Sequence, residues 1–222
     1  MSPDLAAWLE SLRVPQRPDE WEVKAALALY GVRAPRGVRL SPDEALPRLT
    51  FGEPYVVKVC SPDILHKTEQ RGVRLKIEAA ALADAVADLR RRFPGQPLLV
   101  EEHLKLSGRE CIVGALVDRE FGPAVMVGAG GILTEIYRDV AFRLAPCEPD
   151  EAVRMIGELK IAPLFSGFRG ITMDAAALAQ VIAATSQLAV DLGDRFSQLD
   201  INPVGDAGDA WVALDAKLIL KT

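Results

Sequence analysis

The residues best suited to chemistry in this sequence lie close together in one stretch, from Tyr55 to Leu75. The stretch opens with an apolar, β-branched run that predicts a buried strand, and Lys58 lies inside that run. Burying an ammonium group costs free energy unless an anion meets it, so Lys58 is either a strand-edge residue or a phosphate ligand. His66 and Lys67 follow in a polar loop. Together these side chains could surround a transferring phosphoryl group, which is our first hypothesis.

The composition is that of an ordinary soluble protein. The chain has 222 residues, enough for one large domain or two small lobes around a cleft, and 50% of the residues are hydrophobic against 26% charged. A net charge of −5 gives no reason to expect a nucleic-acid partner. Charged residues interrupt the apolar runs before membrane-spanning length, and the N-terminus lacks the pattern of a signal peptide. We therefore expect no membrane partner.

The three cysteines, Cys60, Cys111 and Cys147, are far apart and do not form metal-ligand pairs. They are interpreted as small buried hydrophobic residues in a reducing compartment. This interpretation predicts a cytoplasmic protein.

The spacing of apolar residues predicts two α+β lobes. Helices are expected to start at Ser2 and Asp19, and Ser41 with Glu44 forms a capping box for a short helix. Three further helices are expected over 77–93, 149–159 and 174–192. The expected strands are 55–60, 98–102, 110–117, 123–127, 132–137, 140–144, 198–201 and 210–214. We therefore predict a single domain over residues 1–222, with an N-terminal helix and linker (1–18), a first lobe (19–102) and a second lobe (103–222).

Five motifs then occur in order along the chain. They are SPDILHK at 61–67, the segments 108–114, 121–132 and 139–146, and LDINPV at 199–204. Together they resemble the ATP-grasp subunit or domain of ADP-forming acyl-CoA synthetases, relatives of succinyl-CoA synthetase β chains. One such motif would be a weak signal, whereas five in order make chance unlikely. The resemblance covers the chain from about residue 21 onward. It implies an α+β ATP-grasp fold with the nucleotide held between two lobes.

The resemblance also implies nucleotide-binding residues. Lys58 matches a strand lysine that contacts the nucleotide phosphates. Val100, Glu101 and Leu104 match the connector between the lobes, which holds the adenine mostly through backbone groups. Glu110 matches a glutamate that meets the ribose.

Two further sets are implied in the same way. Asn202 and Asp215 match two magnesium ligands, and Mg²⁺ indeed takes only one or two hard oxygen ligands from protein. His66 matches a histidine that relays phosphate, for which a neutral imidazole is a suitable nucleophile. The segment Arg71–Gly72 departs from the family, which has two consecutive glycines there. Arg71 removes backbone freedom from the loop that carries His66, and so affects how that loop closes.

These residues also have ordinary structural interpretations. His66 alone would be a loop histidine with ordinary hydrogen bonds, and Asn202, which precedes a proline, would be a turn former. Gly128, Gly130 and Gly131 could cradle a phosphate, but we interpret them as structural.

The function implied by the resemblance is that of an ATP/ADP-binding β subunit of an ADP-forming acyl-CoA (acetyl-CoA) synthetase, which is an acid–CoA ligase. With Mg²⁺, it would exchange phosphate between ADP/ATP and a histidine of a separate α subunit that carries CoA-binding and ligase domains, in an α₂β₂ complex. One alternative is a stand-alone ATP-grasp carboxylate ligase that works through an acyl phosphate. Another is a non-catalytic subunit that senses nucleotide.

Overall fold

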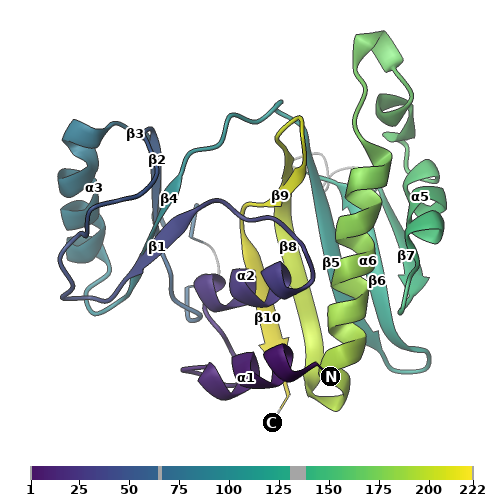
Figure 1. Cartoon of the computed structure of the whole chain (residues 1–222), viewed down its shortest axis with the longest axis horizontal. Coiled ribbons are helices and arrows are strands. Elements are labelled where there is room, and N and C mark those ends of the chain that lie inside the picture. The colour runs from purple at the N-terminus through teal and green to yellow at the C-terminus, as the bar shows by residue number, and fades with distance from the viewer. Residues whose placement is uncertain (1, 65–66, 131–138, 222) are drawn as a thin grey trace. The chain divides into compact units, whose positions relative to one another are not determined.

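The computed structural model describes residues 2–64, 67–130 and 139–221 of the chain (Figure 1). The chain divides into two compact units, each with its own sheet. The larger unit contains Met1–Pro18, Glu22–Ala34 and Leu106–Thr222, and the smaller unit contains Asp19–Trp21 and Pro35–Lys105. The predicted first lobe, 19–102, included the whole second helix. In the structure, Val23, Ala26 and Leu27 of that helix are buried in the core of the larger unit, so most of the helix belongs there.

The smaller unit is a four-stranded sheet with one helix against it. Its strand order is β1 (Gly37–Leu40), β4 (Leu98–Glu102), β2 (Tyr55–Val59) and β3 (Val73–Ile77), and all neighbours are antiparallel. Helix α3 (Ala79–Arg92) buries Leu82, Val86 and Leu89, the helical spacing that the sequence predicts. Strand β3 was not predicted. It is an edge strand in which Leu75 is exposed, so it buries little apolar surface.

The short helix predicted after Ser41 is absent, and a turn takes its place. The backbone N–H of Ser41 donates to the Glu44 carboxylate (2.9 Å), and the N–H of Glu44 donates to the Ser41 carbonyl (3.1 Å). These bonds resemble a helix start, but Pro47 follows closely. Because proline lacks an N–H and clashes with the preceding turn, the helix does not propagate.

The larger unit is built on a six-stranded antiparallel sheet. Its order is β10 (Ala216–Leu220), β8 (Phe196–Asp206), β5 (Glu110–Asp118), β6 (Gly122–Ala129) and β7 (Val140–Leu144), with β9 (Trp211–Ala213) also paired to β8. The predicted strands 110–117 and 123–127 are confirmed as β5 and β6, which pair antiparallel with Cys111 opposite Ala129 and Asp118 opposite Gly122. The predicted strand 198–201 is only the middle of β8, and β10 was not predicted. The predicted strand 132–137 lies outside the described residues.

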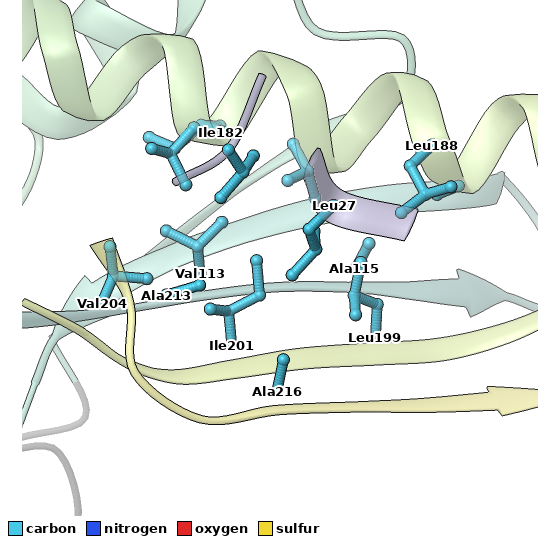
Figure 2. Close-up of a cluster of buried hydrophobic side chains, with 14 of the residues drawn as sticks. Leu27, Val113, Ala115, Ile182, Leu188, Leu199, Ile201, Val204, Ala213 and Ala216 are labelled. Carbon is cyan, nitrogen blue, oxygen red and sulfur yellow. The ribbon is translucent and has the colours of Figure 1, made fainter. Parts of the chain in front are cut away.

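One face of this sheet is covered by helices. They are α1 (Pro3–Ser11), α2 (Glu20–Leu29, of which Glu22 onward belongs to this unit), α5 (Pro149–Gly157) and α6 (Ala175–Leu192), with short 3₁₀ turns at Ala162–Phe165, Phe168–Gly170 and Gly193–Arg195. Figure 2 shows Leu27 of α2 and Ile182 and Leu188 of α6 facing strand residues such as Val113 and Ile201. Side chains that alternate with these along the strands therefore point to the opposite face.

Helix α6 is apolar along most of its length. By length and composition, Ala175–Arg195 could cross a membrane, contrary to the prediction that the apolar runs are too short. In the structure half of this window is buried, and α6 packs against β5, β6 and β8. A buried core helix satisfies the same length and composition criteria, so the observation is weak evidence for membrane insertion.

The core of the larger unit predicts a large effect for one aromatic side chain. Phe196 is completely buried at the start of β8, whereas Phe121 is 69% exposed in the hairpin turn. Phe196→Ala is expected to lower the free energy of unfolding by about 3–5 kcal/mol, because it removes buried area and leaves a cavity. Phe121→Ala is expected to change it by less than about 0.5 kcal/mol. Urea unfolding of both variants measures the difference, and equal midpoints would contradict the described core.

Candidate functional site

Lys58 is the centre of a buried ionic cluster in the smaller unit. It lies on β2, an inner strand between β4 and β3, and it is 5% exposed, so it is not a solvated edge residue. Its ammonium Nζ lies 2.5 Å from Oε1 of Glu20 and 2.7 Å from Oε2 of Glu101. Two carboxylates of the chain itself therefore compensate the burial of this ammonium, and the contact of Lys58 with nucleotide phosphates stays a prediction.

Val100, the first residue of the predicted adenine connector, lies inside strand β4. Val100 is buried in the apolar core of the smaller unit, and β4 is paired on both sides, with β1 and β2. Glu101 is 1% exposed and engaged with Lys58. Only after β4 ends does the chain leave the sheet, at the half-buried Leu104. A role for Val100 in adenine binding therefore stays a prediction, and its side chain is committed to the core.

Glu110, the predicted ribose ligand, is the half-buried first residue of β5. Its carbonyl accepts a hydrogen bond from the N–H of Gly130 (2.9 Å). A Cβ at Gly130 would lie 2.5 Å from the carbonyl carbon of Glu110, so only glycine permits this approach of the two backbones. This contact supports the structural interpretation of Gly130.

Asn202 and Asp215 are neighbours in the larger unit. The N–H of Asn202 donates to the carbonyl of Asp215 (3.0 Å), in line with the register that pairs Ile201 with Ala216. Because Ile201 points into the core, Asn202 points to the face of the sheet opposite the helices, and Asp215 stands beside it. A carboxamide and a carboxylate therefore sit side by side on one face.

A second carboxylate, that of Asp200, lies on the same face and was not predicted. Asp200 is two residues before Asn202 on β8 and directly opposite Lys217 on β10. Burial raises the pKa of Asp200, and the negative charge of Asp215 raises it further, whereas Lys217 opposes the shift. The alternation within the LDINPV motif, with Asp200 and Asn202 two positions apart, is the sequence signal that could have identified it.

These oxygen donors suit magnesium. No group of three His, Cys, Asp or Glu side chains that could hold a metal ion occurs within 2–64, 67–130 and 139–221. A pair of hard oxygen ligands is nonetheless what Mg²⁺ takes from protein when phosphates and water supply the rest. The residues present therefore fit a magnesium ion held by Asn202 and Asp215.

His66 lies outside the described residues, but the loop on either side of it is described. Lys67 is buried, and its ammonium lies 2.5 Å from Oε2 of Glu20. Arg71 adopts φ +55°, in the left-handed region that favours glycine. It stands where the family that the sequence resembles has the first of two glycines. A Cβ at Gly72 would lie 2.9 Å from Cγ1 of Val59, so the second glycine cannot be replaced without a shift. The arginine therefore introduces local strain into a closely packed loop.

The cysteines are not candidate nucleophiles. Cys60, Cys111 and Cys147 are free and buried, which confirms the prediction that they are small buried hydrophobic residues. Burial raises the pKa of Cys60 and Cys111 to about 12 and also raises the pKa of Cys147. The thiols are therefore protonated at neutral pH and unreactive.

Comparison with known proteins matches these features to one family. The family model described as "ATP-grasp domain" matches residues 14–220. The chain belongs to the ATP-grasp domain family. This confirms the predicted family and the predicted α+β fold class.

Relatives of this ATP-grasp chain carry names of acid–CoA ligases. It is 36% identical to the acetate–CoA ligase [ADP-forming] I subunit beta of Pyrococcus furiosus, over 96% of both chains. It is 33% identical to the acetate–CoA ligase [ADP-forming] I of Archaeoglobus fulgidus, covering 87% of this chain but only 30% of that protein. The same domain thus occurs both as a subunit and within a longer chain.

A solved relative shows the fold with ligands. It is the acetyl-coenzyme A synthetase 1 of Ca. Korarchaeum cryptofilum, in complex with coenzyme A and Mg-AMPPCP, with its phosphohistidine segment pointing towards the nucleotide binding site. Its TM-score to this ATP-grasp chain is 0.80, with 29% sequence identity and full coverage of both chains.

The paired oxygen ligands give a prediction for the ATP-grasp chain. Asn202→Ala and Asp215→Ala are each expected to weaken Mg²⁺-dependent nucleotide binding at least about tenfold, since each removes one of few protein ligands. Calorimetric titration with ATP at several Mg²⁺ concentrations measures the effect. Asp194→Ala, at an exposed site after α6, is the control. An unchanged Mg²⁺ dependence in both variants would remove the pair from the metal site.

Proposed function

We propose that this chain is the nucleotide-binding β subunit of an ADP-forming acyl-CoA synthetase. It transfers phosphate between ADP/ATP and a histidine of a separate α subunit, and this transfer is coupled to the interconversion of an acid and its acyl-CoA. The observation that carries the proposal is the match over 96% of both lengths to a protein named as a beta subunit of an acetate–CoA ligase. The buried ammonium of Lys58 and the side-chain oxygens of Asn202 and Asp215 support it.

The described residues have defined tasks in this proposal. Phosphoryl transfer requires positioning and neutralisation of charge more than covalent chemistry. The ammonium of Lys58 counters the negative charge of the nucleotide phosphates, and Glu101 orients that ammonium. The oxygens of Asn202 and Asp215 hold Mg²⁺, which supplies further positive charge to the phosphates when it is bound.

His66 receives the phosphoryl group in this proposal. Its neutral imidazole nitrogen forms a bond to the γ-phosphorus of ATP as the bond from that phosphorus to the ADP oxygen breaks. The phosphoryl group then passes to the histidine of the α subunit. In the direction of ATP synthesis the same steps run backwards, so ADP accepts the phosphoryl group.

The assembly and location belong to the same proposal. The α subunit carries the CoA-binding and ligase regions, and the two chains form an α₂β₂ complex. The three free, buried thiols are in keeping with a reducing compartment, the cytoplasm.

One reconstitution experiment separates the candidate functions. The purified chain is incubated with ATP, Mg²⁺, acetate and CoA, with and without the α subunit, and acetyl-CoA and ADP are measured. The proposal predicts both products only when both subunits are present. Product formation by the chain alone would instead indicate a stand-alone ligase, and full activity of the α subunit without the chain would indicate a sensing role.

A further inference from the structure

Glu20 connects two buried lysines of the smaller unit. Its carboxylate reaches Lys58 through Oε1 and Lys67 through Oε2, each at 2.5 Å. Glu20 is 4% exposed and both lysines are 5% exposed, so the bridge lies away from bulk solvent. One carboxylate therefore holds a residue of strand β2 and a residue of the loop that follows it.

The loop is fixed at Lys67 by its backbone as well. The carbonyl of Lys67 accepts a hydrogen bond from the N–H of Gly72 (2.6 Å), and the carbonyl of Gly72 accepts one from the N–H of Val59 on β2 (2.9 Å). Lys67 directly follows His66 in the sequence. The anchored residue is thus the covalent neighbour of the residue to which the proposed function assigns phosphate.

Opposite charges meet at several points in this cluster. Lys58 faces Glu101 in addition to Glu20, and beside them Asp19 pairs with Arg39 of β1 (2.6 Å). The nearby thiol of Cys60 has a pKa raised to about 12, by burial first and then by the charges of Asp19 and Glu20, while Lys67 opposes this shift. Removing the charge of Glu20 would therefore take negative charge away from two buried ammonium groups, which costs free energy.

We infer that Glu20 is a positioning residue for phosphoryl transfer: it keeps Lys58 and Lys67 charged and ties the loop at Lys67 to the strand that carries Lys58. This inference rests on the proposed function and adds Glu20 and Lys67 to the residues that serve it. The geometric reason is that both oxygens of one carboxylate are used, one for each lysine. A shorter side chain with the same charge cannot keep both contacts at the same length.

Two substitutions separate charge from reach. Glu20→Gln keeps the size and removes the charge, so the pKa of both lysines is expected to fall by at least about one unit. Glu20→Asp keeps the charge but loses one methylene. It is expected to leave both lysines charged and to lower kcat about 10²-fold with little change in KM for nucleotide, because the loop is misplaced.

The experiment titrates lysine side chains by NMR and measures turnover with the α subunit. In Glu20→Gln, both Lys58 and Lys67 should titrate at lower pH than in the unsubstituted protein. The loss of turnover at alkaline pH should likewise begin at a lower pH. In Glu101→Gln, only Lys58 should shift strongly. Lys24, which donates to the Leu214 carbonyl (2.9 Å), is the internal control.

The outcomes are distinguishable. A shift of one lysine only in Glu20→Gln, or turnover per folded molecule that is unchanged in both variants, would overturn the inference while the proposed function stands. Absence of partner-dependent turnover in the unsubstituted protein would overturn the proposed function and this inference with it. Should Glu20→Gln fail to fold, the kcat and KM of Glu20→Asp decide alone.

Discussion

Replacing His66 with alanine is expected to abolish partner-dependent acyl-CoA formation, with a loss on the order of 10³-fold or more. The physical reason is that the imidazole nitrogen is the group that accepts the phosphoryl group, and alanine offers no nucleophile in its place. Nucleotide binding should remain nearly intact, because binding depends on other side chains. Acetyl-CoA formation and ATP affinity are the two measurements.

The sequence offers a matched control for this prediction. It contains only two histidines, His66 and His103. The N–H of His103 donates to the carbonyl of Pro54 (2.9 Å) directly after β4, and the residue has no assigned role in transfer. His103→Ala should retain turnover. If His66→Ala also retains turnover, His66 has no part in the mechanism.

Replacing Lys58 with methionine is the second change with a large expected effect. It leaves the buried carboxylates of Glu20 and Glu101 with one ammonium fewer, so the free energy of unfolding should fall by about 3–5 kcal/mol. It also removes the cation that counters charge on the phosphates, which should lower the rate of transfer by roughly 10²–10³-fold. Chemical denaturation and single-turnover phosphoryl transfer measure the two effects separately.

A double variant separates stability from catalysis. Lys58→Met with Glu101→Gln removes one positive and one negative charge from the cluster. We expect it to recover much of the stability lost in Lys58→Met, because fewer buried charges remain unbalanced, and to recover no activity. Recovery of activity together with stability would show that Lys58 serves the fold rather than the phosphates.

Local features of the sequence predicted most of the elements that position the site. The apolar run around Lys58 predicted a buried strand, and the spacing of Leu82, Val86 and Leu89 predicted α3. Strands β3 and β10 were missed because lysine or arginine residues stand between their apolar residues. The same alternation, as in Ala216, Leu218 and Leu220 of β10, is in retrospect a strand signal.

The partners of the site residues were harder to predict. Glu20 looks in the sequence like an acidic residue at a helix start, where it has an ordinary role beside the helix dipole. Its contacts with Lys58 and Lys67 depend on how the chain is folded, which no local pattern encodes. The alternation with Asn202 could have placed Asp200 on the same face, but its interaction with Asp215 depends on the pairing of β8 with β10.

The most direct test of the proposed function follows phosphate from the partner to the nucleotide. The α subunit, labelled with radioactive phosphate on its histidine, is mixed with ADP and Mg²⁺, with and without this chain. We expect the label to appear in ATP only when the chain is present. Label that stays on the α subunit in the presence of the chain, or that reaches ATP equally well without it, would contradict the account.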